Sequence, residues 1–245
     1  MKLPTGVGAA APDFLAATAQ AMSACESLKT MTAEIAVSGS VAGHRLRARL
    51  LGGFTSSAAR LEAVAPAGPP FFIFVANKED ATLLLPREDR VIEHGRSDAV
   101  LEAIAGVRIG PAGLFEALTG CVVPRWRYAE RVGDTWRIGT TEDGVKLYLH
   151  RDSTSTPWQA AAMLSPGIGQ AWSWRADYRD IHGGLPRSVS LVSADRHQFS
   201  LQLTLSQVET GVPLEADVFR VRIPPSAQPI ALEELRQSGP FARRP

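Results

Sequence analysis

The chain has 245 residues, of which 45% are hydrophobic and 21% charged, and its formal net charge is +1 at pH 7. This length allows one large domain or two small ones and can bury a sizeable core. The near-neutral charge argues against a nucleic-acid-binding protein and against electrostatic docking of the whole protein on anionic lipid. No stretch approaches the roughly 20 apolar residues of a membrane helix. Residues 1–6 lack the apolar run of a signal peptide, which indicates a trimmed mature end or an artificial start.

The amino-terminal third changes from helical to strand periodicity. Residues 1–12 are rich in Gly, Ala and Pro, and we expect them to be disordered. Asp13 is a suitable N-cap for a helix over residues 14–28. In residues 45–50 three arginines alternate with apolar residues, which predicts a strand, and residues 33–38 are its expected hairpin partner.

The next segment, residues 61–92, is apolar without alternation and is interrupted by a Pro- and Gly-rich turn at residues 65–70. A strand with one face in solvent alternates apolar and polar residues, so both faces of these strands must be covered. We expect a helix on one face and a cavity for an apolar ligand on the other. The strands predicted in this region are residues 58–65, 70–77, 81–86 and 90–93.

Two short helices are predicted in mid-chain, at residues 97–105 and 111–119, the second with a Pro near its start and a Gly at its end. Residues 213–225 read as extended, and residues 232–235 as a helical turn. The fold class that follows is mainly β with α: a curved, incompletely closed antiparallel β-barrel capped by short helices. We expect a single domain over residues 1–245, with residues 210–245 as a carboxy-terminal extension. The later strands are predicted at residues 133–139, 144–151, 157–165, 170–179, 187–194 and 198–209.

Motifs for catalysis are missing from the sequence. The five histidines include no His-x-x-x-His pair, there is no Gly-x-Ser-x-Gly elbow, and the glycines at 167 and 169 lack the third glycine of a dinucleotide loop. We therefore expect no enzyme, no metal and no cofactor. The two cysteines, Cys25 and Cys121, fit one disulfide in an oxidising compartment. The alternative is two unpaired buried cysteines.

The order of several segments resembles the periplasmic lipoprotein-carrier superfamily of LolA and LolB, and most closely the outer-membrane lipoprotein receptor LolB. No single motif is specific, and the resemblance extends over about residues 31–209. The stretches that carry it are residues 45–50, residues 60–62 with the Pro66-Ala67-Gly68 turn, the helices at 101–106 and 111–120, the hairpin at 174–187, and the strand at 201–208. Two features depart from LolB: Ala67 stands where LolB has an exposed Leu, and residues 212–225 look more like the end of LolA.

The resemblance implies a non-catalytic carrier or receptor that holds the acyl chains of lipoproteins, or another lipid, for transfer through the periplasm to the outer membrane. The implied partners are those lipids, a periplasmic carrier protein and the outer membrane in transient contact, with no nucleic acid. The implied location is the periplasm, with any outer-membrane anchor in a segment absent from this chain. A different alternative is a structural or interaction protein of the cell envelope whose barrel is filled by its own side chains.

Site residues follow from the alternation in residues 45–50 and from these implied roles. We expect the turn Pro66, Ala67 and Gly68 to face a membrane or a partner. The two mid-chain helices, residues 97–105 and 111–119, correspond to the lid of the carrier. We expect Cys25 and Cys121 to form a disulfide between the first helix and the end of these lid helices. The hydrophobic cavity is predicted to be lined by nine residues of the strands and the lid: Leu46, Leu50, Leu61, Ile73, Leu83, Leu101, Ile104, Leu114 and Phe115.

Overall fold

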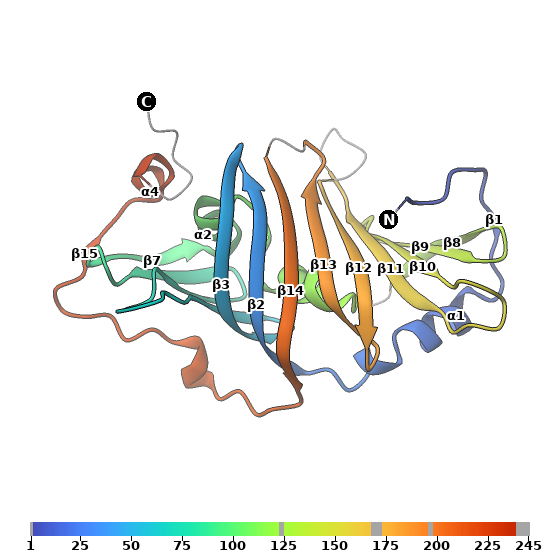
Figure 1. Cartoon of the computed structure of the whole chain (residues 1–245), viewed down its shortest axis with the longest axis horizontal. Coiled ribbons are helices and arrows are strands. Elements are labelled where there is room, and N and C mark those ends of the chain that lie inside the picture. Colours follow the sequence, from blue (N-terminus) through green and yellow to red (C-terminus); the bar gives the residue numbers. More distant parts are fainter. Residues whose placement is uncertain (1, 123–124, 168–172, 196–197, 239–245) are drawn as a thin grey trace. The chain divides into compact units, whose positions relative to one another are not determined.

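The structure is a computed structural model that describes residues 2–122, 125–167, 173–195 and 198–238. Its contacts divide the chain into two compact units: residues 1–27 with 116–194 form unit 1, and residues 28–115 with 195–245 form unit 2. Both are built mainly from antiparallel strands with a few short helices (Figure 1). The order of the described strands has two ends, so the run of strands in each unit is open.

Unit 1 combines a seven-membered run of strands with helix α1 (Phe14–Ala21) and a 3₁₀ turn η1 (Ser23–Cys25). Helix α1 packs on β9, β10 and β11, and its Phe14 meets the ring of Trp126, the first residue of β8, edge-on at 4.9 Å. The strands, in sheet order, are β1 (Ala9–Ala10), β8 (Trp126–Val132), β9 (Trp136–Thr141), β10 (Lys146–His150), β11 (Gln159–Ser165), β12 (Trp174–His182) and β13 (Leu185–Ser193).

Unit 2 contains the long curved strands that Figure 1 labels β2, β3 and β14. The β2–β3 hairpin turns at Ala42 and Gly43, both with positive φ, which is the backbone that suits a two-residue hairpin loop. Helices α2 (Ser97–Ala105), α3 (Pro111–Thr119) and α4 (Leu232–Ser238) complete the described regular structure, with α3 crossing the boundary between the units. The strands, in sheet order, are β14 (Phe199–Thr210), β2 (Thr30–Val41), β3 (His44–Thr55), β4 (Ala58–Ala63), β5 (Ile73–Asn77), β6 (Asp80–Leu85), β7 (Arg90–Arg96) and β15 (Gln228–Pro229).

The carboxy-terminal segment explains why β4 and β5 are apolar on both faces. After β14 the chain forms a second 3₁₀ turn, η2 (Ala216–Phe219), which contacts β4 and β5. Arg60 of β4 donates to the carbonyl oxygens of Val218 and Arg220, each at 3.2 Å. The segment then adds β15 parallel to β7 and ends in α4 against α2 (Figure 1). The outer apolar face of β4 and β5 is therefore covered by this segment, and the cavity expected on the opposite face stays a prediction.

Several local predictions differ from the structure. Residues 9–10 form β1 rather than disordered chain, because Ala9 and Ala10 pair with Arg131 and Glu130 of β8. Helix α1 ends at Ala21 instead of residue 28, and η1 follows it. Strand β8 was not expected, and of the strand predicted at 170–179 residues 170–172 lie outside the described residues. The prediction of a single domain stays a prediction.

Candidate functional site

Strand register defines an inner face on the sheet of unit 2. Cross-strand partners have side chains on the same face, and Leu50 is opposite Ala63 while Leu61 is opposite Gly52 and Phe74. Phe74 is in turn opposite Leu83, and Leu83 opposite Ile92. Leu46 is four positions before Leu50 in β3. Its side chain points to the same face, because side chains alternate along a strand. The register thus places Leu46, Leu50, Leu61 and Leu83 on one face, the inner face, and their role in lining a cavity stays a prediction.

Ile73 does not belong to this face. It pairs with Glu62 on β4 and Leu84 on β6, so its side chain lies on the outer face. The neighbouring Phe74 takes the inner position instead, with about 1% of its surface exposed. The prediction for Ile73 was wrong by one residue, because in a strand that is apolar on both faces the sequence cannot define the register.

Helix α2 covers part of the inner face. It packs against β5, β6 and β7, and Val100 lies directly over Gly95, where an added Cβ would meet its Cγ2 at 2.5 Å. Gly95 pairs with Ala81, which places this contact on the inner side. Leu101 and Ile104 of α2, and Leu114 and Phe115 of α3, are also buried. Burial alone does not place these four side chains on the inner face, so their role stays a prediction.

Exposure falls along the inner face from β3 to β6. Leu46, Ala48 and Leu50 of β3 are half-buried, whereas Leu61 is 5% exposed and Leu83 is fully buried. The β4–β6 part is consequently filled by packed side chains, and the accessible apolar surface of this face is on β3.

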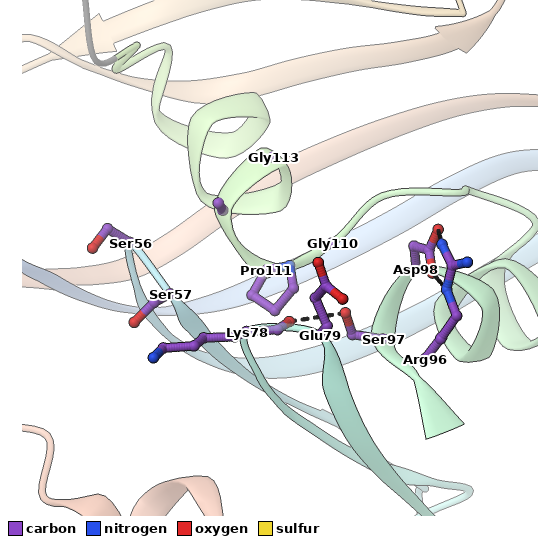
Figure 2. Close-up of a pocket in the computed structure, with 11 residues that line it drawn as sticks. Ser56, Ser57, Lys78, Glu79, Arg96, Ser97, Asp98, Gly110, Pro111 and Gly113 are labelled. Carbon is purple, nitrogen blue, oxygen red and sulfur yellow. Dashed lines mark hydrogen bonds and ion pairs between the residues drawn. The ribbon is translucent and has the colours of Figure 1, made fainter. Parts of the chain in front are cut away.

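A separate pocket of about 410 Å³ lies at the turn end of the unit 2 sheet, and Figure 2 shows the side chains that line it. Hydrogen bonds between turns build it: Lys78 N–H donates to Ser57 O at 2.7 Å, and the Ser97 hydroxyl donates to Lys78 O at 2.9 Å. Its charges balance, because Lys78 and Arg96 are matched by Glu79 and Asp98, and Arg96 is already paired with Asp98 at 2.9 Å. None of the nine predicted cavity residues lines this pocket.

The turn Pro66-Ala67-Gly68 is exposed, and a residue outside it holds its shape. Arg87, in the β6–β7 turn, donates through Nε to Pro69 O at 3.0 Å and through Nη2 to Ala67 O at 2.8 Å. Its guanidinium also lies 4.2 Å from the ring centroid of Phe71, which is 51% exposed. Gly68 has φ of +77°, a conformation that favours glycine. No local sequence pattern points to this role of Arg87, because strands β5 and β6 separate the two turns along the chain.

The end of α3 in unit 1 is fixed by the disulfide between Cys25 and Cys121, whose Cα atoms are 5.5 Å apart. Close by, the Tyr178 hydroxyl donates to the carbonyl oxygen of Glu116 at 3.3 Å. Burial, with a smaller contribution from the Asp143 carboxylate, raises the pKa of Glu116 to about 7. Burial also raises the pKa of Tyr178. Glu116 was not singled out from the sequence, because a lone Glu in a helix usually faces solvent.

In the part of the chain that the structure describes, no three His, Cys, Asp or Glu side chains gather as a metal site would need. Each described helix is too short or too polar to span a bilayer.

Comparison with solved structures shows which fold this is. A LolA superfamily protein from Nitrosomonas europaea aligns with a TM-score of 0.57 and 13% identity, over 79% of this chain and 91% of the other. A DUF1329 family protein from Desulfovibrio piger ATCC 29098 aligns with a TM-score of 0.57 and 12% identity, over 86% and 98% of the two chains. A putative outer membrane lipoprotein-sorting protein domain from Vibrio parahaemolyticus aligns with a TM-score of 0.54 and 11% identity, over 84% of this chain and 96% of the other. No protein-family model matches, and neither does any curated protein sequence.

These similarities establish the fold: a mainly antiparallel, open sheet of the LolA type with short helices, which confirms the predicted fold class. At these identities they are evidence of fold alone. The resemblance is confirmed for the superfamily fold, and the closer likeness to LolB stays a prediction.

Proposed function

We propose that this protein is a non-catalytic carrier or receptor that binds the acyl chains of lipoproteins, or of another lipid, on the inner face of unit 2. The observation that carries the proposal is the continuous apolar face from Leu46 and Leu50 to Leu61 and Leu83, with α2 over its far end. The fold shared with a LolA superfamily protein and with a putative lipoprotein-sorting domain supports it.

An acyl chain would first contact the half-buried residues of β3. Leu46, Ala48 and Leu50 offer accessible apolar surface, whereas Leu83 is out of reach beneath its neighbours. Deeper binding therefore requires α2 to move away from β5–β7, as a lid does. Burial of apolar surface contributes roughly 25 cal/mol per Å², and the ordering of the chain reduces the net affinity.

The proposed setting is the periplasm, where the protein exchanges its cargo with a periplasmic carrier protein and touches the outer membrane transiently. A disulfide in unit 1 fits an oxidising compartment. The exposed Pro66-Ala67-Gly68 turn with Phe71 is the proposed point of membrane or partner contact.

Native mass spectrometry of protein purified without detergent tests the proposal directly. We expect co-purified species with the masses of lipids or acylated peptides. Leu50→Asp puts a charge on the inner face, and Leu51→Asp puts it on the outer face, where Leu51 is 47% exposed. Loss of the bound species in Leu50→Asp alone supports the inner face as the site, and equal retention in both variants contradicts it.

A second candidate is a structural or interaction protein of the cell envelope. The packed side chains at Leu61, Leu83, Leu101 and Ile104 favour it, because a filled interior leaves no space without movement of α2. Protein that carries no lipid after purification, and that does not displace a fluorescent fatty acid from solution, would select this candidate.

A further inference from the structure

Half of β3 has a neighbouring strand on one side only. The whole of β3 pairs with β2, but β4 pairs only with Leu50–Phe54, and one further bond joins Val64 N–H to Arg49 O at 2.8 Å. In an antiparallel strand the backbone groups of alternate residues point to the same side. The N–H and C=O groups of Arg45 and Arg47 therefore point to the same side as those of Arg49, where β4 has ended.

The end of β4 leaves this side open in unit 2. β4 stops at Ala63, and the chain turns away through Pro66. Among the described residues, no hydrogen bond fills the open positions at Arg45 and Arg47. Figure 1 shows β2 along one side of the upper part of β3 and no described strand along its other side. Four residues, 45–48, thus form an unpaired strand edge.

The side chains of this edge are charged on one face and apolar on the other. Arg49 is paired with Glu34 at 2.9 Å. Arg45 and Arg47 are exposed, and neither has a carboxylate within ion-pair distance among the described residues. On the inner face Leu46 and Ala48 are half-buried. The edge therefore combines free backbone groups, two uncompensated positive charges and a small apolar surface.

We infer that residues 45–48 are a docking edge for an acidic, extended segment of another protein, which adds to the sheet as an antiparallel strand. Strand addition takes its affinity from backbone hydrogen bonds and its specificity from alternate side chains. Acidic residues of the segment would face Arg45 and Arg47, and small apolar residues would face Leu46 and Ala48. A second copy of this chain does not suit the edge, because it would set arginines opposite arginines.

The short length of the open edge limits the affinity and the lifetime of the complex. Only Arg45 and Arg47 have backbone groups on the open edge. Each offers one N–H donor and one C=O acceptor, so the segment binds weakly and exchanges quickly. Exposed charges are screened by salt, so we expect binding to weaken steeply as the ionic strength rises.

The test is a titration of the full-length, ¹⁵N-labelled protein with an acetylated, amidated heptapeptide of alternating Glu and Val. We expect shifts of the Arg45 and Arg47 amides and slower hydrogen exchange at both. A peptide of alternating Lys and Val should not bind. The acidic peptide with N-methyl groups on the residues that pair with β3 keeps its charge but loses the backbone bonds, so it should bind about tenfold more weakly.

Variants of the protein test whether the charges of Arg45 and Arg47 contribute to peptide binding. Arg45→Glu/Arg47→Glu should weaken binding by tenfold or more, and the neutral Arg45→Gln/Arg47→Gln by less. Arg220→Glu/Arg222→Glu makes the same change of charge on the carboxy-terminal segment and should bind as the unmodified protein does. Circular dichroism establishes that each variant is folded.

Three results would overturn the inference. Absence of peptide binding would mean that the arginines only protect the edge from aggregation. Binding that tolerates N-methylation would show charge attraction without strand addition. Shifts of the Arg45 and Arg47 amides with phosphatidylglycerol vesicles, but not with the peptide, would assign the edge to lipid instead.

Discussion

Glu116 is a carboxyl group held where its charged form is disfavoured. Burial at the end of α3 raises its pKa from about 4.5 to about 7, and Asp143 adds repulsion. The folded protein therefore keeps a proton that the unfolded chain releases above pH 4.5. This contribution to stability is fully present below pH 4.5 and is lost as the pH rises through 7. Asp13 acts in the opposite sense, because its hydrogen bond to Arg137 lowers its pKa.

Glu116→Gln is expected to remove this pH dependence. Because glutamine keeps the shape without the charge, the variant should be more stable than the unmodified protein at pH 8, by about 1–2 kcal/mol after allowance for partial exposure. At pH 5 the difference should be small. All five tryptophans lie within residues 116–194, so tryptophan fluorescence during urea unfolding follows unit 1.

The matched control is Glu142→Gln, which changes an exposed glutamate in the same unit. It should leave the free energy of unfolding unchanged at both pH values. A Glu116→Gln variant that is equally destabilised at pH 5 and pH 8 would mean that the carboxylate makes a needed contact, contrary to this interpretation.

Residue-level prediction from sequence succeeded where polar residues mark the faces and failed where they do not. In β3 the arginines identify Leu46 and Leu50 as inner residues, and the register agrees. In β5 the run from Phe72 to Val75 carries no polar marker, so Ile73 and Phe74 could not be told apart. Arg87 and Glu116 were missed because their roles arise from contacts distant in sequence.

At the scale of elements, helices with clear end signals were predicted well. Helices α2 and α3 have the bounds that the sequence predicted, and α2 ends at Gly106 in the left-handed conformation typical of a helix stop. The cover of the outer face was missed, because nothing local in residues 212–230 shows that they lie against β4, β5 and β7. β8 was missed because residues 126–132 mix aromatic, charged and small side chains.

The disulfide links two elements that are 96 residues apart in unit 1. By restricting the unfolded chain, a bond across a loop of this length contributes about 2–5 kcal/mol to stability. We expect Cys25→Ser/Cys121→Ser to lower the urea midpoint of unit 1, followed by tryptophan fluorescence. Reduction of the unmodified protein should lower it by a similar amount.

Thiol titration provides the independent check on this bond. Without reductant, the protein should show no reactive thiol, either in its folded state or after denaturation. Two thiols titrated in the denatured, unreduced protein would show that Cys25 and Cys121 are not joined. An unchanged midpoint in the double variant would show that the bond does not stabilise unit 1.

At the scale of the whole molecule, the sequence predicted the class of fold through the order of its segments. Alternating strands, two mid-chain helices and further strands predict an open, mainly antiparallel sheet, and the fold aligns with the LolA superfamily protein at a TM-score of 0.57 and 13% identity. The division of contacts into two units was not apparent, since no linker-like composition separates them in sequence and both units are discontinuous. Unit 1 takes its residues 1–27 from far outside its main segment, which no local pattern reveals.

Association of the molecule with a membrane is predicted to depend on the exposed turn at Pro66-Ala67-Gly68. Arg87 holds this turn through two carbonyl oxygens, so a side chain introduced at Ala67 is presented without rearrangement of the backbone. Ala67→Leu adds apolar surface that a bilayer interface can partly bury, for about 1 kcal/mol or roughly fivefold tighter binding. Ala67→Asp and Phe71→Ser should weaken binding, and co-sedimentation with neutral phospholipid vesicles measures all three.

The control for this experiment is Ala216→Leu, which adds the same side chain to an exposed position on η2. If the turn makes the contact, Ala216→Leu should bind as the unmodified protein does, because only apolar surface at the contact point is removed from water. Equal gains in Ala67→Leu and Ala216→Leu would indicate unspecific adsorption. Equal binding by the unmodified protein, Ala67→Leu and Ala67→Asp would exclude the turn from membrane contact and leave the inner face of unit 2 to meet lipid by another route.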